Sequence, residues 1–217
     1  MSERAIAAQD IPAGKRDPEA RQRRLLQAAT EEFAARGLEG ARVDEIARQA
    51  GVNKQLVYHY FGNKDGLYLE VLEQAYQRMI LAKMSLNLKG LAPYQELEKL
   101  VAFTYDYYRG HREFVSLLND ENVHRARHIR QSRTLLPKYV EMMEMLGSVL
   151  RRGGEDGSLR PGIDPVQFYI TLSGMCYFYF GNMHTLSVIF DRDLSTEEAL
   201  AIRRQHVIDT VMNSVRP

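Results

Sequence analysis

Four hydrogen-bonding side chains lie close together in one short stretch of the sequence: Lys54, Gln55, Tyr58 and His59. If this stretch is helical, the four share one face, because residues three and four apart are neighbours on a helix. Leu56, Val57 and Tyr60 occupy the other side and are suited to packing on a core. The polar face is therefore available to a partner outside the domain.

A second short helix and a turn are predicted to position that face. Residues 43–50 carry Ile46 and Ala47 on one apolar side. Gly51 can adopt the left-handed conformation that ends a helix. Asn53 can accept a backbone N–H and so begin the next helix. Two short helices joined by a glycine-containing turn form the helix-turn-helix pattern.

The remaining sequence also predicts helices. A first helix begins near Pro18, after the capping residue Asp17, and stops at Gly37. A long amphipathic helix runs from Asn63 to about residue 86 and is suited to connecting two modules. Further helices follow from residue 94, with a glycine-rich loop predicted at residues 153–158.

The last two predicted helices differ in character. The helix at residues 166–190, opened by Asp164, is apolar or small nearly all round and is predicted to be buried on more than one side. The final helix begins at Ser195, and Glu198 stands three residues later as in a capping box. No strand-like alternation occurs in the sequence, so the predicted fold is all-α with about nine helices.

Composition narrows the class of protein. The chain has 217 residues, 45% of them apolar, which is enough to bury a sizeable core. It has no apolar run of 18 residues or more and no secretory signal in its first residues, so we expect no membrane span and a cytoplasmic location. The single cysteine, Cys176, fits a reducing compartment and excludes an intrachain disulfide. The net charge of +1 means that any nucleic-acid partner must be bound by a local basic surface.

The sequence resembles the TetR (tetracycline repressor) family over residues 20–75. The motifs that carry the resemblance are Phe33 and Gly37, then Val43-Asp-Glu-Ile-Ala, Ala50-Gly-Val-Asn, Leu56-Val-Tyr-His-Tyr-Phe and Asn63-Lys-Asp-Gly-Leu67. The rest of the chain resembles the family in the number and order of its helices. The resemblance implies a homodimeric regulator, most often a repressor, that binds palindromic operator DNA and is released by a small-molecule effector.

The resemblance also implies a division of the chain. Independently of the resemblance, residues 1–17 have mixed charges and no periodicity and are predicted to be a flexible arm, in which Lys15 and Arg16 either reach DNA or belong to a solvated tail. Residues 18–65 would form the three-helix helix-turn-helix domain, and residues 66–217 the helical domain for ligand binding and dimerisation.

Seven DNA-binding residues follow by position: Arg42, Asn53, Lys54, Gln55, Tyr58, His59 and Lys64. Residues 53–59 would form the recognition helix in the major groove, where Gln55 or His59 could contact a base. Lys54 would lie near a phosphate or a guanine edge, and Tyr58 and Lys64 would contact phosphates. The family commonly has Ser or Thr before the first short helix, where this chain has Ala41 and Arg42, and we expect Arg42 to take over that phosphate contact.

The effector pocket and the dimer interface are predicted less directly. Flexible methionines and aromatic residues are suited to a ligand cavity, and a few polar groups would orient the ligand. The predicted pocket residues are Tyr105, Tyr108, Met142, Met145, Met175, Phe178 and Asn182. The family dimerises through its last two helices, which implies an interface containing Phe168, Leu172, Tyr179, Val207, Ile208 and Val211.

Other residues that could do chemistry are open to simpler interpretations. His124 and His128 have the four-residue spacing of a helical metal site, but the neighbouring arginines favour a solvated or ion-paired face. Cys176 has no flanking base and is interpreted as a buried spacer. We expect no catalytic residue, no metal and no cofactor. The alternative function is a helical ligand-binding or enzymatic protein with a vestigial helix-turn-helix.

Overall fold

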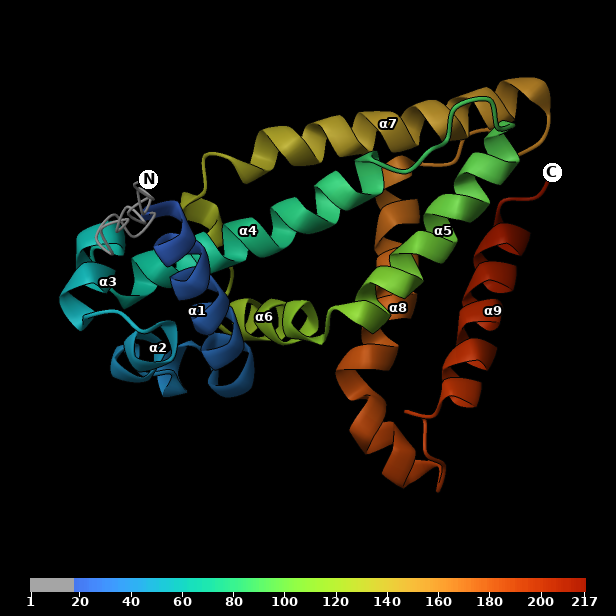
Figure 1. Ribbon diagram of the computed structural model, residues 1–217. Helices are drawn as coiled ribbons and strands as arrows, with labels where there is room; N and C mark the ends of the chain where they lie inside the picture. Colours follow the sequence, from blue (N-terminus) through green and yellow to red (C-terminus); the bar gives the residue numbers. More distant parts are fainter. Residues whose placement is uncertain (1–17) are drawn as a thin grey trace, which may run out of the picture.

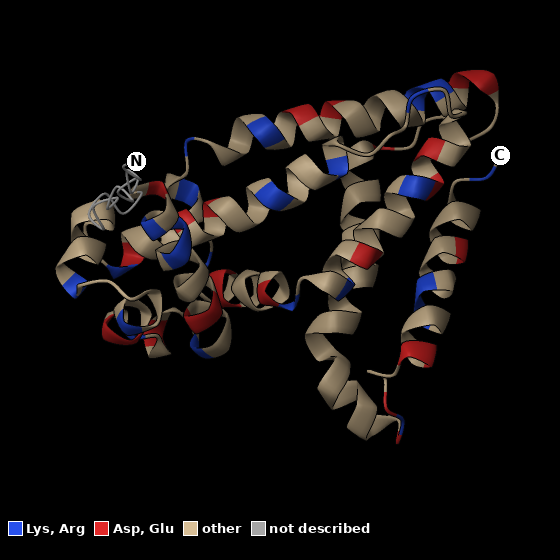
Figure 2. Ribbon diagram, viewed as in Figure 1, with Lys and Arg blue, Asp and Glu red and all other residues tan. Residues whose placement is uncertain are grey.

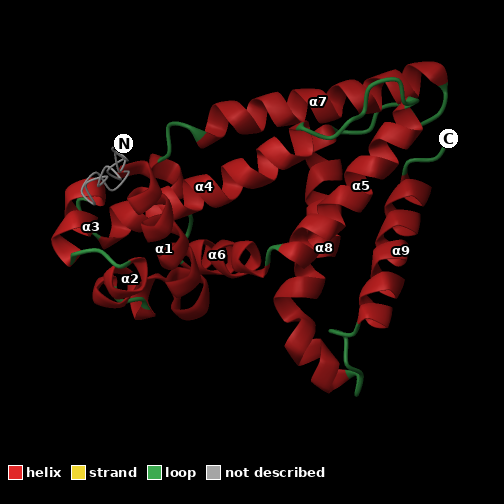
Figure 3. Ribbon diagram, viewed as in Figure 1, coloured by secondary structure: helices red, strands yellow, loops and turns green. Residues whose placement is uncertain are grey.

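The computed structural model describes residues 18–217 and shows nine α-helices and one short 3-10 helix in that range, with no strand (Figures 1 and 3). The elements are α1 (Pro18–Gly40), α2 (Val43–Ala50), α3 (Lys54–Phe61), α4 (Lys64–Met84), α5 (Pro93–Gly110), α6 (Arg112–Val123), η1 (Ile129–Gln131), α7 (Leu135–Asp156), α8 (Pro165–Ile189) and α9 (Glu197–Ser214). The all-α prediction is confirmed. The predicted arm, with Lys15, Arg16 and the cap Asp17, lies outside the described residues.

The first three helices form one end of the molecule, and α4 leads from them to the other end (Figure 1). Helix α1 packs against α2, α4 and α6, while α5 packs against α7, α8 and α9. Helix α6 lies between the two ends and contacts both α1 and α8. The helix-turn-helix is therefore held against the larger helical part through α4 and α6.

Local capping chemistry explains most helix boundaries. Gly51 ends α2 in the left-handed conformation (φ 66°, ψ 36°). The side-chain oxygens of Asn53, Asn63 and Asp164 accept the backbone N–H groups two or three residues later and open α3, α4 and α8. These starts agree with the sequence-based predictions.

Three boundaries differ from the predictions. Gly37 has a positive φ of 65°, but its ψ of 175° is not left-handed helical, and the chain adds another turn up to Gly40. The predicted loop at 153–158 is wrong at its start, because α7 continues to Asp156. Gly153 serves close packing there: an added Cβ would lie 2.4 Å from Leu159 Cδ1. The cap of α9 is Thr196 rather than Ser195, since the Thr196 side chain accepts the Ala199 N–H.

Helix α8 carries no Lys, Arg, Asp or Glu over its 25 residues (Figure 2). One side of it is buried in the core, and the other leaves Val166, Ile170 and Phe178 more than half exposed. No helix within residues 18–217 is long and apolar enough to cross a membrane.

Candidate nucleic-acid interface

Helix α3 presents the predicted polar face to solvent. Lys54, Gln55, Tyr58 and His59 are all exposed, whereas Val57 on the opposite side is 1% exposed and anchors the helix. Asn53 is also exposed, but its side-chain oxygen accepts the Gln55 N–H at 2.8 Å. Asn53 therefore fixes the first turn of α3 and, with it, the direction of Gln55.

Lys54 is already paired within the protein. Its Nζ lies 2.7 Å from Asp44 Oδ1 on α2 and 5.8 Å from the centre of the Tyr58 ring. The hydrogen bond to Asp44 raises the pKa of Lys54, so the ammonium stays charged. Both partners are solvent-exposed, and such surface pairs are weak. A phosphate could therefore draw Lys54 away from Asp44 at small cost.

Arg42 stands just before α2 with its side chain exposed and without a side-chain cap of its own. Buried Glu32 on α1 accepts the Arg42 backbone N–H at 3.1 Å through Oε1. Glu32 also pairs with Arg36 at 3.4 Å. Glu32 thus accepts the N–H of the residue that precedes α2, the bond that a capping-box glutamate makes, and the Arg42 side chain is left for other contacts.

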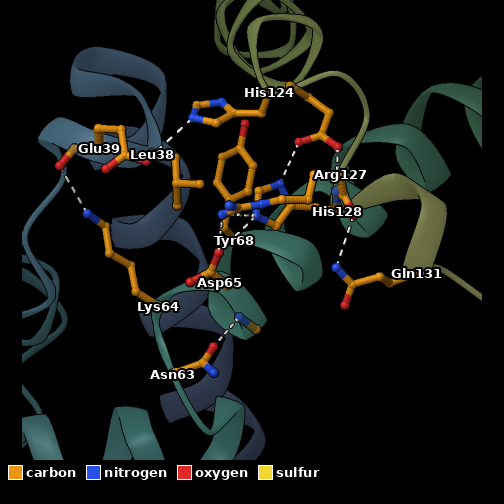
Figure 4. Close-up of polar contacts among 12 residues, drawn as sticks. Leu38, Glu39, Asn63, Lys64, Asp65, Tyr68, His124, Arg127, His128 and Gln131 are labelled. Atoms are coloured by element: carbon orange, nitrogen blue, oxygen red, sulfur yellow. Dashed lines mark hydrogen bonds and ion pairs between the residues drawn. The ribbon is translucent and has the colours of Figure 1, made fainter.

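Lys64 lies at the N-terminal end of α4, beside the first three helices. Its Nζ donates a hydrogen bond of 3.2 Å to the Glu39 carbonyl oxygen (Figure 4). The start of α4 is capped by Asn63, and the positive end of a helix favours a nearby anion. Lys64 and Arg42 therefore lie at the two ends of the helix-turn-helix segment.

Behind this surface, a buried polar network joins α4 to α6 and the segment 124–131 (Figure 4). His128 is 1% exposed, with Nδ1 at 2.8 Å from Glu121 Oε2 and Nε2 at 3.1 Å from Asp65 Oδ1. Arg127 also binds Asp65 at 2.6 Å. Of the two predicted alternatives, a solvated or an ion-paired face, His128 shows the ion-paired one, and its side chain is buried. The imidazole is enclosed because two carboxylates satisfy its nitrogens.

The same network reaches α1. Asp120 Oδ2 accepts the Leu38 N–H at 2.9 Å and the Tyr68 hydroxyl at 2.7 Å. His124 Nδ1 meets the Asp120 carbonyl oxygen at 2.8 Å. Within residues 18–217, no group of three or more His, Cys, Asp or Glu side chains is arranged to hold a metal ion.

Sequence reasoning missed Glu32 and Asp120. Each accepts a backbone N–H from outside its own helix, and these contacts span 10 and 82 residues. No local motif marks such residues. The one available signal was that carboxylates stand in otherwise apolar-periodic helices, where a buried charge must be paired.

The predicted pocket residues are not brought together at one place. Met142 and Met145 line a cavity of about 10 Å³, and Tyr108 lines a neighbouring hollow of about 430 Å³. Tyr105 is fully buried and donates to the Leu200 carbonyl oxygen, joining α5 to α9. Phe178 is 57% exposed, and Asn182 donates to the Phe178 carbonyl oxygen. Met175 is half-buried and, like Phe178 and Asn182, lies outside the lining of both cavities.

The six residues predicted for the dimer interface all lie inside the protomer. Each is less than 9% exposed: Phe168, Leu172, Tyr179, Val207, Ile208 and Val211. The periodicity of a helix that is apolar all round does not reveal which side faces its own core. The exposed large apolar residues of the same helices are Val166, Ile170, Phe178, Val188 and Ile189 on α8 and Ile202 on α9.

Comparison with known proteins agrees with this architecture. Residues 25–71 match the family model described as "Bacterial regulatory proteins, tetR family", and residues 93–211 match "Tetracyclin repressor-like, C-terminal domain". The chain is 35% identical over 192 residues to the HTH-type transcriptional repressor NicS of Pseudomonas putida, covering 88% of this chain and 91% of NicS. It is 41% identical over 105 residues to the HTH-type transcriptional repressor SCO4008 of Streptomyces coelicolor, covering 48% and 50% of the two chains.

The same fold occurs in solved structures. The fatty acid degradation regulator FadR of Bacillus halodurans superposes with a TM-score of 0.68 at 20% identity, over 91% of this chain and 96% of FadR. Because the curated relatives are transcriptional repressors, the prediction of a DNA-binding regulator rather than an enzyme is confirmed. The chain belongs to the TetR family of bacterial transcriptional regulators.

Proposed function

We propose that this protein is a homodimeric repressor that binds a palindromic operator in the cytoplasm and leaves it when a small-molecule effector binds. The observation that carries the proposal is the outer face of α3. It exposes Gln55, Tyr58 and His59 while Val57 fixes the helix to the core. A rigid helix with exposed hydrogen-bonding side chains is suited to the major groove.

The side chains divide into two groups in this proposal. Gln55 and His59 contact base edges, with Gln55 suited to a bidentate contact with adenine. Arg42, Lys54, Tyr58 and Lys64 contact phosphates, and Lys54 exchanges Asp44 for a phosphate. Asn53 acts through the backbone by holding the first turn of α3.

The dimer is proposed to form through the exposed apolar faces of α8 and α9. Val166, Ile170 and Phe178 recur at intervals of four or eight residues along a helix that has no Lys, Arg, Asp or Glu. Ile202 on α9 is 64% exposed. Apolar residues that line one helix face are a usual site of association between copies of a chain. Two recognition helices would then reach half-sites about 34–36 Å apart, or a multiple of that distance.

DNA binding is tested by fluorescence anisotropy with the DNA upstream of the protein's own gene and with a scrambled duplex. Wild type is expected to prefer the upstream DNA. Gln55→Ala should reduce that preference by about 1–3 kcal/mol, because it removes a base contact. Arg42→Ala and Lys64→Ala should each weaken binding to both duplexes. Each should also reduce the steepness of the plot of log affinity against log salt concentration by roughly 1.

Gln49→Ala is the matched control, because Gln49 is exposed on α2 and hydrogen-bonds to Glu45 at 2.8 Å. It should leave affinity and salt dependence unchanged. The proposal is wrong if wild type binds upstream DNA no better than scrambled DNA. The phosphate role of Arg42 is wrong if Arg42→Ala keeps the wild-type salt slope.

A further inference from the structure

Lys83, in the last turn of α4, is a buried cation without a partner carboxylate. Only 6% of the residue is exposed, and no carboxylate within residues 18–217 forms an ion pair with it. Its Nζ lies 5.4 Å from the centre of the Tyr169 ring on α8. Burial lowers the pKa of Lys83 to about 8, so the ammonium is still mostly protonated at neutral pH. A buried charge that is not compensated destabilises a fold and calls for an explanation.

The ammonium borders a small apolar cavity between α4, α5, α7 and α8. The lining also includes Leu100, Met142, Leu146 and Phe168, and the cavity of about 10 Å³ has room for about one water molecule. Thr104 is a polar neighbour, but its hydroxyl donates to the Leu100 carbonyl oxygen at 2.7 Å. Lys83 is therefore the charged group that an incoming molecule would meet here.

A larger hollow is also lined by Tyr169. Its volume of about 430 Å³ falls within the range of roughly 300–1,000 Å³ that is usual for small-molecule sites. Five tyrosines contribute to its lining: Tyr76, Tyr108, Tyr139, Tyr169 and Tyr177. Burial raises the pKa of Tyr76, Tyr108 and Tyr139, so their hydroxyls remain protonated and can donate hydrogen bonds.

The hollow and the cavity share a lining residue. Tyr169 lines both spaces, and Lys83 borders the gap between them together with Tyr108 and Ser173. Tyr169 is only partly buried. A turn of this ring would join the hollow to the ammonium.

We propose that the effector is a small aromatic monocarboxylate whose ring packs among the tyrosines of the hollow and whose carboxylate pairs with Lys83. The inference deepens the proposed function, since it assigns a chemical class to the effector. An aromatic ligand is favoured because the tyrosine rings offer edges and faces for ring packing. The rings already pack edge to face with one another, with centroid distances of 6.0 Å for Tyr76–Tyr139 and 6.3 Å for Tyr139–Tyr169. One negative charge is favoured over a phosphate dianion, because the ammonium can neutralise only one.

The test compares the binding of carboxylic acids with the binding of their uncharged primary amides at pH 7. The probes are benzoate, phenylacetate, 3-phenylpropionate and cinnamate, each beside its primary amide, in thermal-shift and calorimetric titrations. Three proteins are used: wild type, Lys83→Met and Lys89→Met. Methionine keeps the length of the side chain without the charge, and Lys89 is an exposed lysine just beyond α4.

Wild type and Lys89→Met are expected to bind at least one acid roughly tenfold or more tightly than its amide, because the acid forms a buried charge-assisted hydrogen bond. Lys83→Met should lose that preference while its amide affinities stay within about twofold. Unliganded Lys83→Met should melt at or above the wild-type temperature, which shows that it folds.

Two results would overturn the assignment. One is that no acid stabilises wild type more than its amide does, and the other is that Lys83→Met keeps the acid preference. DNA binding without any probe is measured in parallel on the same proteins. If the proteins do not bind DNA specifically but acid binding still depends on Lys83, the repressor proposal is rejected and the carboxylate site stands.

Discussion

His128 is enclosed on both sides by acidic groups, Glu121 at Nδ1 and Asp65 at Nε2. Glu121 also accepts the backbone N–H groups of His128 and Ile129, at 2.8 and 3.0 Å. The buried carboxylate thus holds both the imidazole and the chain that carries it. Asp65 is different, because about half of its side chain is exposed and it also binds Arg127.

Asp65 makes the stability of the protein depend on pH. The hydrogen bond from His128, with the nearby charge of Arg127, lowers the pKa of Asp65 in the folded state. A carboxylate with a lowered pKa adds stability above its unfolded pKa of roughly 4, and that contribution is lost as the pH falls through the lower folded value. Asp65→Asn should therefore be less stable than wild type at pH 7 by about 1 kcal/mol or less, since the group is half-exposed.

The measurement is the melting temperature of wild type and Asp65→Asn between pH 7 and pH 3. The difference in melting temperature between the two proteins should be largest above pH 5 and should disappear toward pH 3. Asp191→Asn is the control, because Asp191 is exposed and takes part in none of the ion pairs found in residues 18–217. A gap that stays constant down to pH 3 would show that the Asp65 charge does not contribute.

At the scale of helices, Asp120 ties three elements together. It projects from α6 and binds the Leu38 N–H of α1 and the Tyr68 hydroxyl of α4. Gly37 allows this approach, because a Cβ at that position would lie 2.6 Å from Asp120 Oδ1. These contacts thereby fix the position of the three-helix end relative to α6.

Asp120→Ala is expected to destabilise the protein by about 2–3 kcal/mol, because it leaves the Leu38 N–H and the buried Tyr68 hydroxyl without their acceptor. Tyr68→Phe removes one of the two bonds and should cost about 1 kcal/mol. Urea denaturation of both single variants and the double variant gives the coupling between them. A double variant whose loss equals the sum of the single losses would contradict the direct hydrogen bond.

The contrast between Asn53 and Asp120 shows what the sequence could predict. Asn53 caps a helix two residues from its target, so residue type and spacing identified it, as they did for Gly51 and Asn63. Residue type and spacing also predicted which side of α3 is polar and exposed. Asp120 acts on Leu38 across 82 residues, and nothing local distinguishes it from a surface aspartate.

Helix α8 marks the second limit of sequence reasoning. Its composition indicated burial on several sides, but an apolar pattern all round has no preferred direction. Phe168, Leu172 and Tyr179, which the resemblance places in the interface, face the core of the protomer, and Phe178, predicted for the pocket, is exposed. Tertiary packing decides these directions, and only the structure shows it.

Across the whole molecule, α4 links the two proposed sites. Its 21 residues span roughly 30 Å, with Lys64 at the DNA-facing end and Lys83 in the last turn beside the cavity. A ligand that binds one position of α4 more tightly than another would shift the helix-turn-helix at its other end. A ligand with equal affinity for both positions would have no effect on DNA binding.

Such a shift matters for DNA only if two recognition helices are held at a fixed spacing, and this makes the dimer testable. Phe178→Glu places a charge in the proposed apolar interface, where it would be costly to bury. Sedimentation velocity at micromolar concentration should show a dimer for wild type and a monomer for Phe178→Glu. Affinity for a palindromic operator should fall roughly tenfold or more, while affinity for a single half-site should be unchanged, because only the second contact is lost.

Val123→Glu introduces the same charge on α6, where the side chain is 79% exposed, and this variant should remain dimeric. Unchanged helicity by circular dichroism would show that Phe178→Glu still folds. If folded Phe178→Glu sediments as a dimer, the pairing surface lies elsewhere than on the Val166, Ile170 and Phe178 face. If it is a monomer yet binds the palindrome as tightly as wild type, the spacing between two half-sites is not what sets operator affinity.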